Sequence, residues 1–130
     1  MYVNIFFAEG MENQQQGFAQ RLSVINPFVA MRAPFIPTAL SFTVGIVING
    51  IKPNTSYDFD ISITNKETGQ EAFKQTINSF SIPEENMDNL TINFDLKNVP
   101  FENEGEYECV FSIGSYAKSE SLFSQVHNPV

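Results

Sequence analysis

Alternation of apolar and polar residues with a period of two constrains this chain more than any other feature of its sequence. Leu40, Phe42, Val44, Ile46 and Ile48 alternate with mostly polar neighbours, and the same period recurs three more times further along the chain. A strand with one buried and one solvated face has this period, whereas an amphipathic helix repeats every three to four residues. We therefore expect antiparallel strands that share one core.

Each of these runs has one phenylalanine on its apolar face, and the whole chain has 13 phenylalanines. We expect Phe42, Phe59, Phe94 and Phe111 to face the core. The polar segment Asn65–Gly69 ends in a glycine that can adopt a positive φ. We expect it to close a hairpin between strands at 56–65 and 70–78, and further strands at 39–49 and 116–126.

The chain has 130 residues, a length that suits one domain. Its apolar runs recur about every ten residues with no helical crossover between them, as in a sandwich of two sheets. We therefore predict an all-β, single-domain antiparallel β-sandwich of seven or eight strands over residues 1–130.

Residues 9–37 do not follow the alternation. Met11–Gln20 is polar, and prolines follow at positions 27, 34 and 37. Because proline cannot donate a ladder hydrogen bond, it is confined to edges and bulges. We predict that residues 9–37 form an irregular, Pro-containing loop or edge segment, with a candidate strand at 21–28.

Residues 103–109, Asn-Glu-Gly-Glu-Tyr-Glu-Cys, resemble the immunoglobulin-type tyrosine corner, Asp-x-Gly-x-Tyr-x-Cys. Gly105 allows a tight turn into the strand, and the hydroxyl of Tyr107 can return to a backbone group a few residues upstream. Cys109 has no partner cysteine and the chain has no Trp. The resemblance therefore implies an Ig-like sandwich that is not an immunoglobulin.

The layout of nearly the whole chain also resembles an uncharacterised family of small bacterial and phage proteins, a domain of unknown function. The matching features are a first strand ending in Ala8-Glu9, a Pro-rich stretch from Pro27 to Pro37, a strong strand over 39–49, and a Gly-x-Tyr strand from Gly105 to Ile113. The resemblance implies an Ig-like fold, and it carries no activity or functional residue to this chain.

Charge and hydropathy exclude two classes of partner. With 7 basic and 15 acidic residues, the formal net charge is −8, so we expect no nucleic acid partner. No apolar run approaches the roughly 20 residues that span a bilayer, so we expect no membrane partner. Residues 1–10 lack the cationic start and long apolar core of a secretion signal, so we expect a cytoplasmic protein with a reduced thiol.

The sequence shows no catalytic, cofactor or metal constellation, and we expect a protein that is not an enzyme and has no cofactor. His127 stands close to the end of the chain, where a catalytic base is hard to hold. Cys109 lies on the apolar face of its strand, where burial disfavours the thiolate. The acidic loop Glu84–Asn89 lacks the ligand spacing of a calcium-binding loop.

Glu102, Glu104, Glu106 and Glu108 are spaced by two, which places them on one face if the strand already runs there. Like charges so arranged cost stability unless they are solvated or paired with cations. This face is either a solvated outer surface or an acidic surface that attracts a basic partner or mimics nucleic acid.

Phe28, Phe35 and Ile36 lie among prolines. They are either core residues inserted from an irregular segment or an exposed apolar patch, which usually marks a protein contact. With an edge strand nearby, they are candidates for a surface through which the chain pairs with a second copy of itself.

The sequence leaves three classes of function as hypotheses. The first is a non-enzymatic protein-binding or interaction module, self-associating through an edge strand in one version. The alternative is a phage or prophage accessory protein, either a virion component or an inhibitor that uses its acidic face against a basic host target. A carbohydrate-binding sandwich is less favoured, because Trp is absent and Tyr2 and Tyr116 are the candidate exposed aromatics.

Overall fold

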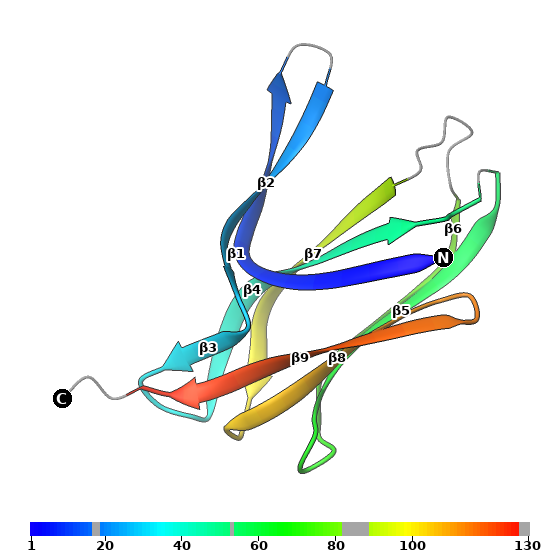
Figure 1. The fold of residues 1–130 in the computed structure, drawn as a ribbon. Helices are drawn as coiled ribbons and strands as arrows, with labels where there is room; N and C mark the ends of the chain where they lie inside the picture. The colour runs from blue at the N-terminus through cyan, green and yellow to red at the C-terminus, as the bar shows by residue number, and fades with distance from the viewer. Residues whose placement is uncertain (17–18, 53, 82–88, 128–130) are drawn as a thin grey trace.

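The computed structural model describes residues 1–16, 19–52, 54–81 and 89–127, with the backbone alone at 13–16, 19–21 and 89. These residues form two β-sheets and no helix (Figure 1). The prediction of an all-β fold is confirmed, and the two sheets fit a β-sandwich.

Nine strands make up the two sheets in the described residues. They are β1 (Tyr2–Gln16), β2 (Ala19–Phe28), β3 (Ala30–Ala33), β4 (Thr38–Asn49), β5 (Ser56–Asn65), β6 (Glu71–Ser81), β7 (Asn89–Phe101), β8 (Gly105–Ile113) and β9 (Tyr116–Val126). One sheet has the order β2-β1-β4-β7, and the other has the order β3-β9-β8-β5-β6. We call them the four-stranded and the five-stranded sheet.

The strand count and one pairing differ from the prediction of seven or eight antiparallel strands. β3 pairs with β9 in parallel, Ala30 beside Phe123 and Ala33 beside Val126. The cause is the chain path. After β2 the chain leaves the four-stranded sheet at Val29 and joins the other sheet as β3. There it runs beside β9 in the same direction as β9, so the two strands are parallel and are not the two arms of a hairpin.

Residues 9–37 also differ from the irregular segment that the sequence predicts. The second half of β1 and most of β2 form a hairpin that projects from the sandwich (Figure 1). This part of the hairpin adds no strand to the core, so it lacks the apolar alternation that reveals the other strands. The edge-like path is observed, because β2 and β3 are the outer strands of their sheets.

The core lies between the sheets and is rich in aromatic residues. Phe42, Phe59, Phe94 and Phe111 are all buried, as the alternation predicts. The ring centroids of Phe59 and Phe111, on neighbouring strands, are 5.6 Å apart. From the opposite sheet, the ring of Phe94 packs against the ring of Phe111, and their centroids are 6.5 Å apart. Burying each phenyl side chain stabilises the fold by about 1.5–3 kcal/mol.

Two local predictions are confirmed in detail. The Asn65 side-chain oxygen accepts hydrogen bonds from the backbone N–H groups of Glu67 and Thr68, both at 2.9 Å, and Gly69 has a φ of 76°. Tyr107 is buried, and its hydroxyl donates a hydrogen bond of 2.7 Å to the carbonyl oxygen of Asn103. The first contact closes the β5–β6 hairpin, and the second fixes the entry to β8.

Candidate functional site

One continuous segment, β2 followed by β3, covers part of the edge of both sheets. β2 pairs with β1 from Phe7 onward, with Phe7 beside Phe28. The chain then crosses at Val29, whose carbonyl accepts a hydrogen bond from the Phe123 N–H at 2.8 Å. From there β3 pairs with the end of β9. The crossing therefore closes one end of this side of the sandwich.

On this side of the sandwich, the parts of β1 and β9 that do not pair with β2 or β3 are open edges among the described strands. Residues Tyr2–Phe6 of β1 pair with β4 on one side and with no described strand on the other. Residues Tyr116–Leu122 of β9 likewise pair only with β8 among the described strands. β1 and β9 lie next to each other on this side (Figure 1). We call Tyr2–Phe6 the free edge of β1.

A groove lies where the chain crosses between the sheets. Its volume is about 400 Å³, and it is lined by Ile5, Phe6, Phe7, Pro27, Phe28, Val29 and Glu120. The lining is apolar except for Glu120, whose carboxylate makes no hydrogen bond or ion pair with the residues that the structure describes. An extended segment with apolar side chains fits this lining.

Phe28 separates this groove from a second one of about 240 Å³, which also contains Glu9 and Arg32. The ring of Phe28 is half-buried and packs edge-on against Phe42, with centroids 6.1 Å apart. Phe35 is 65% exposed and Ile36 is half-buried, and neither lines the two grooves. Of the three predicted contact residues, the structure therefore brings only Phe28 to this site.

The free edge of β1 differs in chemistry from every other open edge among the described strands. Each of the others carries charged residues, proline or both: Arg21 and Pro27 in β2, Arg32 in β3, Glu71 and Lys74 in β6, Asp95 and Lys97 in β7, and Lys118 and Glu120 in the open part of β9. Charges and prolines on an exposed edge disfavour its pairing with a strand of another molecule. The free edge of β1, Tyr-Val-Asn-Ile-Phe, has neither, so it is the edge that can accept one.

The four predicted glutamates do not form one strand face. β8 begins at Gly105, so Glu102 and Glu104 lie in the turn before it and Glu106 and Glu108 lie on it. Glu102 accepts a hydrogen bond from the Gln70 side chain at 2.9 Å, and Glu104 accepts one from the Val126 N–H at 3.3 Å. These carboxylates are therefore bonded within the molecule.

Glu106 is the most constrained of the four. It accepts a hydrogen bond of 2.6 Å from the Ser121 hydroxyl and forms an ion pair of 3.0 Å with Lys66. The Ser121 hydrogen bond and then the Lys66 ammonium hold the pKa of Glu106 below its ordinary value. Because this carboxylate already has two partners within the molecule, it should attract a cationic group of another protein less strongly.

The two candidate catalytic residues do not meet. Cys109 is fully buried, and burial together with the Glu120 carboxylate raises the pKa of its thiol to about 12. His127 is exposed beyond the end of β9, where its backbone N–H donates a hydrogen bond to the Ala33 carbonyl oxygen. At neutral pH the thiol is protonated and inaccessible, as the apolar position of Cys109 in its strand predicts.

The described residues contain no cluster of three or more His, Cys, Asp or Glu side chains that could hold a metal ion. Residues 84–88 of the acidic loop considered for calcium lie outside the described residues. Among the described residues, no helix is long and apolar enough to cross a membrane.

A family model matches residues 5–122 of the chain. The chain belongs to this family, which is described as a family of unknown function, DUF6941. The expectation of an uncharacterised family is thereby confirmed. No curated protein matches the chain. In this member of DUF6941 the matched range contains all the residues that line the 400 Å³ groove, from Ile5 to Glu120.

The sequence points to Phe28 but not to the free edge of β1. The alternation of Val3, Ile5 and Phe7 indicates a strand there, and the absence of charge is visible in the sequence. Which neighbours that strand has is not visible, because pairing depends on where β2 leaves β1. The signal that could have marked the site is the uncharged stretch Tyr2–Phe6 in a chain whose other edge strands carry charges.

Proposed function

We propose that this chain is a non-enzymatic protein-interaction module that binds an extended segment of a partner protein as an added strand on the free edge of β1. The observation that carries the proposal is the contrast between this uncharged edge and the charged or Pro-containing edges elsewhere. Strand addition gains affinity from backbone hydrogen bonds and specificity from the pockets that receive alternate side chains.

The groove supplies such a pocket. Val3 and Ile5 point into the core from the free edge, and the side chains of an added strand on that face would enter beside them. There they would meet the apolar wall formed by Phe7, Phe28 and Val29. Apolar residues at alternate positions of the partner segment therefore fit the site.

We also propose that the fold is Ig-like. The buried Tyr107 with its hydroxyl bonded to Asn103 supports this, because Ig-type sandwiches have a tyrosine corner at the start of the corresponding strand. The order β9-β8-β5-β6 corresponds to strands G, F, C and C′, and β1-β4-β7 to A, B and E. The departures are the projecting hairpin and β2 beside β1.

Strand addition can be tested with a labelled synthetic peptide, Ser-Thr-Val-Thr-Val-Thr-Val-Ser, in fluorescence anisotropy titrations. The matched control peptide carries N-methyl groups on its valines, which remove the backbone donors of one edge while keeping the side chains. We expect the first peptide to bind and the second not to bind. Equal binding of both peptides, or of neither, contradicts strand addition.

Two protein variants locate the edge. Asn4 is exposed in the middle of the free edge, so Asn4→Lys adds a charge there without disturbing the core. Ser119→Lys adds the same charge at an exposed position on the open part of β9. We expect Asn4→Lys to weaken peptide binding roughly tenfold, equivalent to about 1.4 kcal/mol, and Ser119→Lys to leave it unchanged. The reverse pattern would assign binding to β9.

A further inference from the structure

We propose that the segment received by the free edge of β1 is the same edge of a second copy of this chain, which makes the protein a two-fold symmetric dimer. This inference rests on the proposed function, because it names the partner of the same edge. Closed two-fold dimers are the most common assemblies of soluble proteins, and they require a patch that is complementary to itself.

The pairing of β1 with β2 fixes the register of such a dimer. Phe7 is already paired with Phe28, so the partner strand can cover β1 only as far as Phe6. An antiparallel self-pairing that uses all of Tyr2–Phe6 then has its two-fold axis at Asn4. It places Tyr2 opposite the partner's Phe6, Val3 opposite the partner's Ile5, and Asn4 opposite the partner's Asn4.

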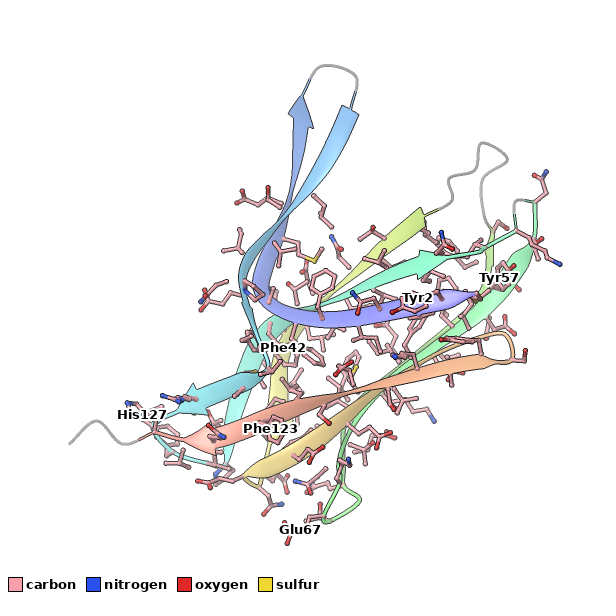
Figure 2. The ribbon with its side chains drawn as sticks, in the orientation of Figure 1. Tyr2, Phe42, Tyr57, Glu67, Phe123 and His127 are labelled. Atoms are coloured by element: carbon pink, nitrogen blue, oxygen red, sulfur yellow. The ribbon has the colours of Figure 1, made fainter. Side chains whose placement is uncertain are left out.

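The side chains of the free edge suit this register. Tyr2, Asn4 and Phe6 share the outer face of the sheet, because they alternate with the buried Val3 and Ile5. Tyr2 is 67% exposed, and its position on β1 is labelled in Figure 2. The register creates two Tyr2–Phe6 cross-strand pairs on that face, and aromatic cross-strand pairs stabilise antiparallel strands. Between them two Asn4 amides face each other, each with donors and an acceptor for the other.

The inner face places apolar residues opposite apolar residues. Val3 is 1% exposed and Ile5 is 4% exposed, so both belong to the core although they lie at an open edge. In the dimer each Val3 lies opposite the partner's Ile5, and because both are already buried in their own copy, the backbone ladder and the outer-face pairs supply the affinity. The result is a continuous sheet in the order β7-β4-β1-β1-β4-β7.

The dependence on salt distinguishes a second copy from a basic partner. The chain has a net charge of −8, so two copies repel each other at long range. The free edge carries no charged side chain, so the copies meet where close repulsion is smallest. Added salt screens the long-range repulsion, and the dimer should therefore tighten as salt rises, whereas a complex with a basic segment should weaken.

The interface is small, because each chain contributes five residues of one strand. Interfaces at the low end of the size range form weak and concentration-dependent complexes. Sedimentation velocity from about 5 to about 500 µM covers the range in which such complexes dissociate. We expect a monomer at the low end, a growing share of dimer toward the high end, and more dimer in high salt.

A charge swap at the two-fold axis tests the register. In Asn4→Lys and in Asn4→Glu, like charges lie directly opposite each other across the axis, and we expect both variants to be monomeric over the whole range. A 1:1 mixture places Lys opposite Glu, and we expect it to associate at least about tenfold more tightly than either variant alone. The matched controls are Ser119→Lys and Ser119→Glu, which should dimerise as the unmodified chain does.

Three results overturn the dimer. They are a monomer at every concentration, a dimer that Asn4→Lys does not weaken, and a mixture that associates no more than its components. The Thr-Val peptide separates this failure from that of the proposed function. A monomeric chain that still binds the peptide at the free edge refutes self-pairing alone, whereas a monomeric chain that binds no peptide refutes strand addition as well.

Discussion

The phenyl ring of Phe6 lies directly over Gly45 on the outer face of the four-stranded sheet. The two residues are cross-strand partners between β1 and β4. A Cβ atom placed on Gly45 would lie 2.2 Å from Cζ of Phe6. An aromatic residue thus covers the backbone of a glycine across the sheet, and this contact adds to the backbone pairing between the free edge of β1 and β4.

The Phe6–Gly45 contact predicts a reversal of sign in a double-mutant cycle. In the unmodified chain, Gly45→Ala should destabilise the fold by about 1–3 kcal/mol, because the new methyl group displaces the ring. In a Phe6→Ala background the same change should be neutral or stabilising, because glycine in a strand normally costs about 0.5–1 kcal/mol relative to alanine. Urea unfolding of the four proteins measures the coupling, and additive effects would mean that the ring moves aside at no cost.

The tyrosine corner gives a second stability prediction. Tyr107→Phe removes the 2.7 Å hydrogen bond to the Asn103 carbonyl and leaves the ring in place. We expect a loss of about 1 kcal/mol in the free energy of unfolding. The control is Tyr57→Phe, whose hydroxyl accepts a longer, exposed hydrogen bond of 3.2 Å from the Lys52 N–H. Equal losses in the two variants would show that the corner has no special role.

The sequence predicts best those strands that have one face in the core and one in water. The predicted strands at 39–49, 56–65 and 116–126 agree with β4, β5 and β9 to within one residue at each end. In each of them burial imposes the alternation that the sequence displays. The tyrosine corner is equally local, because its hydrogen bond joins residues four positions apart.

The projecting hairpin and the candidate site could not be predicted in the same way. Residues 10–16 and 19–25 pair with each other in a hairpin that projects from the sandwich, so the core between the sheets does not impose an alternation on them. The free edge of β1 exists because β2 leaves β1 at Phe28 and crosses to the other sheet. That crossing is a long-range property of the chain path, and an uncharged strand looks the same in a sequence whether its edge is covered or open.

The environment of Glu106 predicts the response of two variants in a carboxyl titration by NMR. The hydrogen bond from Ser121 is the largest single cause that lowers the pKa of Glu106, and Lys66 lowers it through both a hydrogen bond and its charge. Ser121→Ala and Lys66→Met should therefore each raise that pKa. Because the folded-state pKa is depressed, the stabilisation from Glu106 is present above its unfolded pKa and is lost as the pH falls through the folded value. An unchanged pKa in either variant would contradict the role of that contact.

The thiol of Cys109 predicts a loss of stability at alkaline pH. Burial, and then the charge of Glu120, raise its pKa to about 12 from an ordinary value of 9.0. Because the folded-state pKa is raised, the stabilisation is complete below the unfolded pKa and is lost as the pH rises toward 12. Between pH 7 and pH 10, the free energy of unfolding of the unmodified chain should fall by about 1.4 kcal/mol more than that of Cys109→Ala.

Chemical denaturation of both proteins at the two pH values isolates the contribution of Cys109, because the other titrating groups are common to both. Thiol labelling gives an independent measurement: at pH 8 a disulfide reagent should modify the native chain only as fast as the core opens, and the unfolded chain at once. Equal labelling rates, or parallel pH profiles for the two proteins, would place Cys109 outside the core and would contradict the inward orientation of its face of β8.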